Sequence, residues 1–250
     1  MPVTRTPARS PPPQPAANAL IAALPRKDRL RLLAACEPVS LAFAQVLSPP
    51  DGKTRHVYFP TGGFISLIAV TNANTHIEVG LIGDEGMLGI PVFLGVNMSP
   101  LEALVQGAGP ALRISTAAFR NELALSPALR ARLSLYVSVV HSQLAQTAAC
   151  NRFHVVQARM ARWLLMTQDR SHAHTFSITH EFLSYMLGVR RVGVTAAATA
   201  LQGLNLISHE RGKMTILDRA GLESAACGCY QADRDTYARV LGRGPALPLH

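Results

Sequence analysis

The 250-residue sequence has no apolar run of the roughly 18 to 20 residues that a bilayer-spanning helix needs. Its longest apolar stretches, such as FISLIAV at 64–70, have the length of buried strands. The first residues also lack the apolar stretch that a secretory signal requires. We therefore expect a protein of the cytoplasm that has no membrane partner.

Cysteine is scarce as well, with four residues (Cys36, Cys150, Cys227 and Cys229) scattered along the chain. That number and spacing do not make a disulfide framework, and a reducing compartment agrees with the lack of an export signal. Cys227 and Cys229 stand one residue apart and could serve a metal or a redox switch, but thiols without such a role are the commoner case. The sequence therefore predicts no metal site, and it leaves the cofactor unknown.

Lysine occurs three times, yet the chain carries a net charge of +9. Residues 1–110 hold 8 Lys and Arg against 7 Asp and Glu, a net of +1, whereas residues 111–250 hold 16 against 8, a net of +8. A basic half joined to a near-neutral half is typical of a protein whose basic part meets a polyanion. A general bias of the composition toward arginine would give the same excess.

Composition and spacing change several times along the chain. Residues 1–17 are polar and rich in proline, so we expect a disordered tail. In the predicted first domain, residues 18–125, the segment 18–36 has helical spacing, with Pro25 opening a second helix. From 39 to 115, short β-branched and aromatic runs alternate with Gly, Pro, Asn and Asp at regular intervals. This rhythm predicts an antiparallel barrel or sandwich.

The period becomes helical where Ser126 and Pro127 supply a cap and a first-turn proline. One long helix is therefore predicted over 126–150. Its apolar face consists of residues at spacings of three and four, namely Leu129, Leu133, Tyr136, Val137, Val140, Leu144 and Thr147. A helix of this length between two domains often pairs with its twin in a homodimer. The alternative is that this face packs on the barrel of its own chain.

Two short helices joined at one glycine are predicted within the last domain, residues 151–250. Thr179 can cap the first helix, and Gly188 stands at the turn, where glycine tolerates a left-handed conformation. The positions that would bury one face of the second helix are Val189, Val194, Ala197 and Leu201. This is the pattern of a helix-turn-helix, whose second helix enters the major groove of DNA. A packed pair of helices without DNA contact is the alternative.

The next segment, ISHERGKMTIL, predicts two short strands around Arg211 and Gly212. A hairpin directly after the second helix makes a winged arrangement, in which Arg211 and Lys213 can touch phosphates. A single helix over 218–241 is predicted to follow it. The hairpin favours DNA binding over a merely packed helix pair.

The stretch from 178 to 217 resembles the winged-helix domain of the Crp/Fnr family of bacterial transcription regulators. Upstream, HVYFPTGGFISLIAV, GLIGDEGMLGI and the long helix follow that family's order of parts, so the resemblance covers about residues 20–230. It implies an α+β fold with an N-terminal antiparallel β-roll (jelly-roll) sensor domain like those that bind cyclic nucleotides. A long dimerisation helix and a C-terminal winged helix-turn-helix would follow. It also implies a homodimer on an inverted-repeat operator in double-stranded DNA, with RNA polymerase as a further partner.

The resemblance assigns the base-reading positions incompletely. Family members present an Arg–Glu pair and a second Arg one turn later, and the matching residues here are Arg191, Val192 and Ala196. Arg191 can still bond a guanine edge, whereas Val192 cannot accept from cytosine and Ala196 offers at most a methyl contact. Arg190 and Thr195 remain to reach bases or phosphates. With Thr179, Arg211 and Lys213, these residues form the predicted DNA-contacting set.

The predicted sensor half lacks the charges of a usual cyclic-nucleotide site. Cyclic-nucleotide-binding members of the family hold the cyclic phosphate with a Glu and an Arg. Ile90 stands near the place of that Glu, and Ser99 or Pro100 near the place of that Arg. No Lys or Arg occurs from His56 to Leu112, so a buried phosphate would lack a cation. The predicted effector pocket consists of Gly83, Gly86, Gly89, Ile90 and Ser99. We expect no cyclic-AMP binding of the usual kind.

Two other functions are compatible with parts of the sequence. A cupin-like metal-dependent enzyme would need several ligands on neighbouring strands, but the β-region offers only His56 and His76 as imidazoles. His76 and Glu78 point to one face of a predicted strand, which we expect to be exposed and polar. A degenerate regulator that acts through protein contacts alone is the second alternative. No nucleotide-binding loop or hydrolase elbow occurs, so we predict that the chain is not an enzyme.

Overall fold

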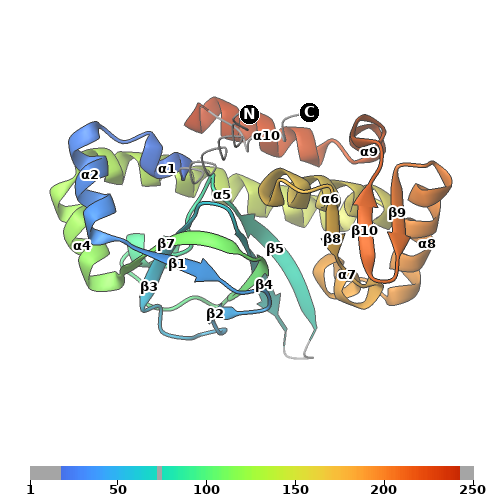
Figure 1. Ribbon diagram of the computed structural model, residues 1–250, viewed down its shortest axis with the longest axis horizontal. Helices are drawn as coiled ribbons and strands as arrows, with labels where there is room; N and C mark the ends of the chain where they lie inside the picture. Colours follow the sequence, from blue (N-terminus) through green and yellow to red (C-terminus); the bar gives the residue numbers. More distant parts are fainter. Residues whose placement is uncertain (1–17, 72–74, 243–250) are drawn as a thin grey trace, which may run out of the picture.

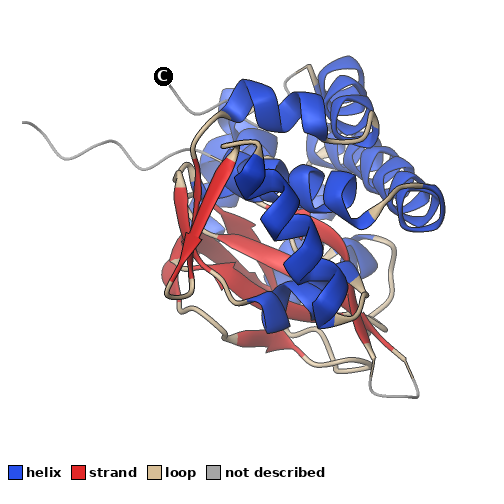
Figure 2. Ribbon diagram, turned by 90° about the vertical axis from the view of Figure 1, so that its right-hand side faces the viewer, coloured by secondary structure: helices blue, strands red, loops and turns tan. Residues whose placement is uncertain are grey.

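The computed structural model describes residues 18–71 and 75–242. The predicted tail over 1–17 lies outside the described residues. Figure 1 shows a roll of strands below one long helix and a smaller helical unit with its own short sheet at the far end of that helix. Seen from that far end, the helices gather above and beside the strands (Figure 2).

The described chain begins with two short helices, α1 (Ala19–Ala22) and α2 (Arg26–Ala35), with Pro25 before α2 as predicted. Asn18 joins them to the roll. Its side-chain oxygen accepts from the amides at the start of α1, as in a usual cap. Its side-chain nitrogen donates to the carbonyls of Pro60 and Gly86, at 3.1 and 2.7 Å.

The roll consists of two antiparallel sheets, which confirms the predicted barrel or sandwich. One sheet has the order β1 (Glu37–Leu41), β7 (Gly109–Ser115), β3 (His56–Pro60). The other has the order β2 (Val46–Ser48), β6 (Glu102–Gly107), β4 (Phe64–Val70), β5 (His76–Ile82). A buried apolar cluster with members from both sheets fills the space between them: Leu41, Tyr58, Ile65, Ile82, Ala103, Val105 and Ala111.

Three helices complete the roll: α3 (Ile90–Phe93), α4 (Thr116–Leu125) and α5 (Pro127–Phe153). The start of α5 is as predicted, because the Ser126 hydroxyl accepts from the amide of Leu129 at 3.0 Å. The helix ends three residues beyond the predicted limit. Leu129, Leu133 and Tyr136 are buried in the chain's own core, so much of the predicted apolar face packs within the chain.

The C-terminal unit starts with α6 (Val156–Ser171), β8 (Thr175–Ser177), α7 (His180–Leu187) and α8 (Arg191–Gly203). It continues with β9 (Ile207–Glu210), β10 (Lys213–Ile216), α9 (Arg219–Ala225) and α10 (Cys229–Leu241). The predicted single helix over 218–241 is wrong. The backbone turns extended at Ala226, and α10 starts anew after Gly228. The helix then returns along α5, on the side away from the roll (Figure 1).

In the described part of the chain, no single helix is long and apolar enough to cross a membrane. Together α4 and α5 reach the required length and composition, but they meet at an angle of 111°.

The face of β5 that carries Glu78 is not exposed, contrary to the sequence-based expectation. Glu78 is 8% exposed and lies against α6, where Trp163 donates to it at 2.9 Å. Ser66 on β4 and Gln106 on β6, in the same sheet, also donate to this carboxylate, at 2.6 and 3.2 Å. A period of two places residues on a common face, but it does not show whether water or another element covers that face.

A second buried contact joins the same parts of the molecule. Arg170, at the end of α6, forms an ion pair at 2.7 Å with Glu85, in the loop after β5. Both side chains are at most 4% exposed. The C-terminal unit is therefore attached to the roll through two buried carboxylates.

Burial raises the pKa of Glu78 to about 7, although its hydrogen bonds and Arg170 act in the opposite direction. A carboxyl group with a pKa raised above its unfolded value stabilises the fold below that unfolded value, and the contribution is lost as the pH rises through 7. We expect Glu78→Gln to flatten the pH dependence of thermal stability between pH 5 and 8. The shift corresponds to about 3 kcal/mol at most.

Melting curves of the variant and the parent at several pH values measure this effect. Glu210→Gln, at an exposed position of β9, is the matched control and should keep the parent's profile. A Glu78→Gln protein that loses as much stability as the parent between pH 5 and 8 would contradict the assignment.

Candidate nucleic-acid interface

The turn between α7 and α8 has the predicted geometry. The Thr179 hydroxyl caps α7 by accepting from the amide of Phe182 at 3.1 Å. Gly188 ends α7 with φ +59°, in the left-handed region that only glycine adopts without cost. A β-carbon added at Gly188 would lie 2.7 Å from Cδ1 of Ile77 on β5. The glycine thus serves both the turn and the close approach of this turn to the roll.

The second helix of the pair, α8, has one buried and one exposed face. Val194, Ala197 and Leu201 are at most 5% exposed and pack in the core of the C-terminal unit. The opposite face carries the predicted DNA-contacting residues, all exposed: Arg190, Arg191, Val192, Thr195 and Ala196. Val192, between these residues, is apolar and 74% exposed.

A hydrogen bond between the two helices restrains one of these residues. The Thr195 hydroxyl lies 3.1 Å from both the carbonyl of Arg191 and Nδ1 of His180, at the start of α7. Because its one hydroxyl proton is used within the chain, Thr195 must release a partner before it can donate to a base. His180 was not among the predicted site residues, because a lone histidine in a first helical turn has no distinctive sequence signal.

His180 also connects the helix pair to the hairpin. Its ring stacks on that of His209 in β9, with centroids 4.5 Å apart. Burial lowers the pKa of His180, and the charges of His209 and Arg191 lower it further. The neutral form of the His180 ring is therefore favoured at the junction of α7, α8 and β9.

The hairpin of β9 and β10 forms the predicted wing. Arg211 and Gly212 have φ of +50° and +77°, as in the tight two-residue turn whose twist fits antiparallel strands. Arg211 and Lys213 are exposed beside this turn. In Figure 1 the turn lies at the same end of the molecule as α7. β8 completes a sheet of order β8-β10-β9.

Comparison with known families identifies this unit, because residues 158–225 match the model of the Crp-like helix-turn-helix domain. The chain contains a Crp-like helix-turn-helix domain. A search of curated protein sequences gave no match.

Solved structures extend the likeness to the fold of most of the chain. It is similar to the Crp/Fnr family regulator TTHA1359 from Thermus thermophilus at 22% identity, with a TM-score of 0.64, covering 76% of this chain and 98% of that one. It is also similar to CLP, a c-di-GMP responsive global regulator from Xanthomonas campestris, at 15% identity and a TM-score of 0.64, covering 77% and 99%. FixK2 from Bradyrhizobium japonicum is 11% identical with a TM-score of 0.65, covering 77% and 98%. The chain has the fold of Crp/Fnr regulators, with the Crp-like domain at its C-terminal end.

The roll that precedes the Crp-like domain contains a cavity of about 390 Å³. Its wall includes residues of both sheets, together with Val140 and Leu144 of α5. Three residues of the predicted effector pocket line it: Gly89, Ile90 and Ser99. Gly83 and Gly86 do not, because they pack against the side chains of Arg170 and Tyr136.

Two cations belong to this cavity. Lys53 and Arg55 line it and are exposed. They precede the cation-free segment from His56 to Leu112, so the cavity has positive charge beside it that this segment does not supply. The chain folds back at the rim of the roll and places these side chains beside an apolar wall.

The histidines considered for a cupin-like centre are apart. His56 is on β3 and lines the cavity, whereas His76 is on β5, in the other sheet, and its ring lies 6.1 Å from that of Tyr185. A group that the sequence did not indicate is formed instead near α10. It consists of Cys150, His154, Cys227 and Cys229.

Proposed function

We propose that this chain is a sequence-specific transcription regulator that binds an inverted-repeat operator as a homodimer. The observation that carries the proposal is a pair of exposed arginines, Arg190 and Arg191, at the start of α8. Next to this helix, the wing carries Arg211 and Lys213 at its two-residue turn. These cations suit phosphates and base edges in neighbouring grooves. A bacterial transcription regulator binds DNA in the cytoplasm, so the proposal includes a cytoplasmic location. It also includes contact with RNA polymerase.

Base reading by α8 depends on few side chains. Arg191 can donate two hydrogen bonds to a guanine edge. Val192 and Ala196 can contact thymine methyl groups, and Thr195 must release a partner within the chain before it can donate to a base. A large part of the specificity should therefore come from phosphate contacts and from the shape of the DNA.

The homodimer would use a different face of α5 from the one that the sequence indicated. An exposed row of mainly small residues runs along this helix at spacings of three and four: Ala131, Ser134, Leu135, Ser138, His141, Ala145 and Ala148. Small side chains let two helices approach closely. Leu135 is 44% exposed, and it would become buried when the rows of two chains pack together. This geometry supports a two-fold pairing of α5 with its twin.

The cavity in the roll suits a ligand with an apolar body and an acidic group. Its wall is mainly apolar, and Lys53 and Arg55 supply the positive charge. Ile90 and Ser99 stand near the places of the family's phosphate-binding residues, so a cyclic nucleotide would lack its usual partners. We infer an amphipathic anion as the effector class.

The two alternative functions have less support. A cupin-like enzyme needs its ligands together, and His56 and His76 lie in different sheets. A regulator that acts through protein contacts alone does not need the exposed pair Arg190 and Arg191 beside a basic wing.

Selection from a random duplex library should enrich an inverted repeat. On that site, Arg191→Ala should weaken binding by about 1–3 kcal/mol, or roughly 5- to 150-fold, because a bidentate base contact is lost. Arg239→Ala removes the same charge from an exposed position of α10 and should bind like the parent. Equal affinities of the Arg191→Ala variant and the parent would contradict base reading by α8.

Lys213 is expected to contact phosphate rather than bases. Lys213→Ala should weaken binding to all duplexes alike and reduce the slope of log affinity against log salt by about 1. Titrations at several salt concentrations measure that slope. A loss confined to the enriched sequence would indicate a base contact instead.

Calorimetry with decanoate and with cyclic AMP tests the effector class. Decanoate should bind, and Lys53→Gln should weaken it, because the carboxylate loses a cation. Lys27→Gln, at an exposed position of α2, is the control and should leave decanoate binding unchanged. Micromolar binding of cyclic AMP would overturn this proposal without affecting the proposal of DNA binding.

A further inference from the structure

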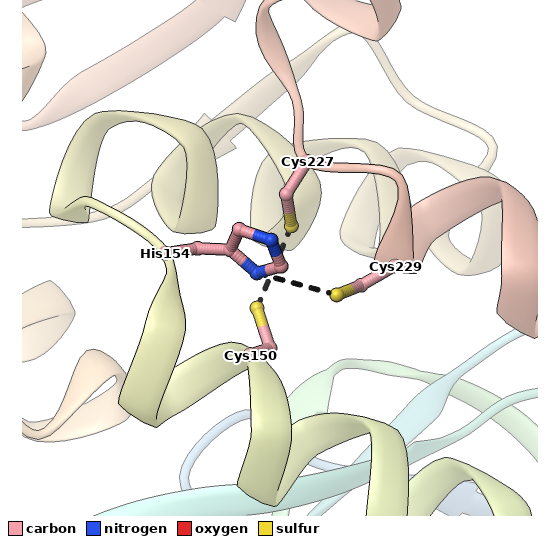
Figure 3. A group of neighbouring side chains, drawn as sticks. All are labelled: Cys150, His154, Cys227 and Cys229. Atoms are coloured by element: carbon pink, nitrogen blue, oxygen red, sulfur yellow. Dashed lines mark hydrogen bonds between the residues drawn. The ribbon is translucent and has the colours of Figure 1, made fainter.

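Four side chains with metal-binding atoms meet at the end of α5, away from both the wing and the cavity. Cys150 and His154 lie one turn apart, and Cys227 and Cys229 flank Gly228 at the start of α10. Figure 3 shows the four side chains pointing toward one another, with the imidazole between the thiols. A spacing of four residues places Cys150 and His154 on one side of the helix.

The distances within this group fit one tetrahedral ion. The Sγ atoms of Cys150 and Cys227 are 3.5 Å apart, and Sγ of Cys229 is 3.4 Å from Nδ1 of His154. All four ligand atoms lie within 4.8 Å of one another. Bonds of about 2.3 Å to sulfur and about 2.0 Å to nitrogen place tetrahedral ligands roughly 3.5–3.8 Å apart. A small contraction of the group would complete such a site.

The protein around the group suits thiolates. Cys150, Cys227 and Cys229 are at most 8% exposed, whereas His154 is exposed and leaves a path for an ion. Gln146 donates to Sγ of Cys229 at 2.9 Å, as second-layer donors do in metal sites. Three thiolates and a divalent ion together carry one negative charge.

Two arginine side chains near the group can offset the single negative charge of three thiolates with a divalent ion. Arg159 and Arg162 lie close enough to influence the thiols of Cys150 and Cys227. The Nε of each arginine is buried and has no hydrogen-bond partner among the residues that the structure describes. Arg162 is already paired with Asp233 at 2.6 Å, so an anionic metal centre would above all provide a charge partner for Arg159.

We propose that Cys150, His154, Cys227 and Cys229 form a structural zinc site. Binding of Zn²⁺ would release three thiol protons to the solvent and leave no open coordination position, as in other Cys₃His sites. The ion would tie α10 to the end of α5, beside the break at which α6 begins. The predictions of no metal site and of cysteines without a role would then both be wrong.

Metal analysis of the full-length protein, loaded with Zn²⁺ under reducing conditions and freed of excess, tests the proposal. We expect one zinc per chain, and Co²⁺ in its place should give the sulfur-to-cobalt charge-transfer band and strong visible bands of a tetrahedral thiolate site. Cys150→Ser and Cys229→Ser should lose both signals. Cys36→Ser removes the fourth cysteine, which lies in another part of the molecule, and should keep them.

A second variant covers the case in which the serine variants do not fold. His154→Ala changes an exposed residue and leaves the three thiols, so the chain should fold but hold zinc roughly tenfold more weakly or worse against a competing chelator. Zinc should raise the melting temperature of the parent and of Cys36→Ser more than that of His154→Ala.

Two results would overturn the zinc site. One is a parent protein that retains no zinc, or no more than its cysteine variants. The other is a disulfide between Cys150 and Cys227 in freshly purified protein, found by non-reducing peptide mapping, since it would consume two of the four ligands. Neither readout involves DNA, so this proposal and that of DNA binding can fail separately.

Discussion

The buried polar contact between β5 and α6 determines where the helix-turn-helix lies relative to the roll. Trp163 donates to the carboxylate of Glu78, and Arg170 is paired with Glu85, with little exposure of any of the four. Removal of one partner from such a buried pair costs about 3–5 kcal/mol, because the other charge remains without water. These contacts also require one particular arrangement, since a slide of α6 would break the Trp163 bond to Glu78 and the Arg170 pair with Glu85.

The same region gives the cavity a direct physical connection to the helix-turn-helix. Val140 and Leu144 of α5 line the cavity, and α5 ends at the break from which α6 leads to α7 and α8. The turn at Gly188 touches Ile77 on β5. A ligand that moves α5, or an ion that fixes its end to α10, therefore acts on packed elements that reach α8.

Most of the fold could be predicted from the sequence, because its signals are local. Some of these signals depend on only a few consecutive residues. Examples are the helix cap at Ser126, the left-handed glycine at Gly188 and the two-residue turn at Arg211. Helical and alternating periods likewise showed which residues share a face, as with Val194 and Leu201 on α8. The predicted single helix at 218–241 was wrong because its period continues across a break that Ala226 and Gly228 introduce.

The sequence by itself determined the order of parts, the helix-turn-helix with its wing, and the exposed arginines on α8. Only the tertiary structure decided what covers each face. It placed Glu78 against Trp163 rather than in water, and it brought Lys53 and Arg55 to the cavity. It also placed the Sγ atoms of Cys150 and Cys227, 77 positions apart in the chain, at a distance of 3.5 Å. Spacing along the chain shows which side of an element a residue occupies, whereas its chemical environment depends on the packing of distant elements.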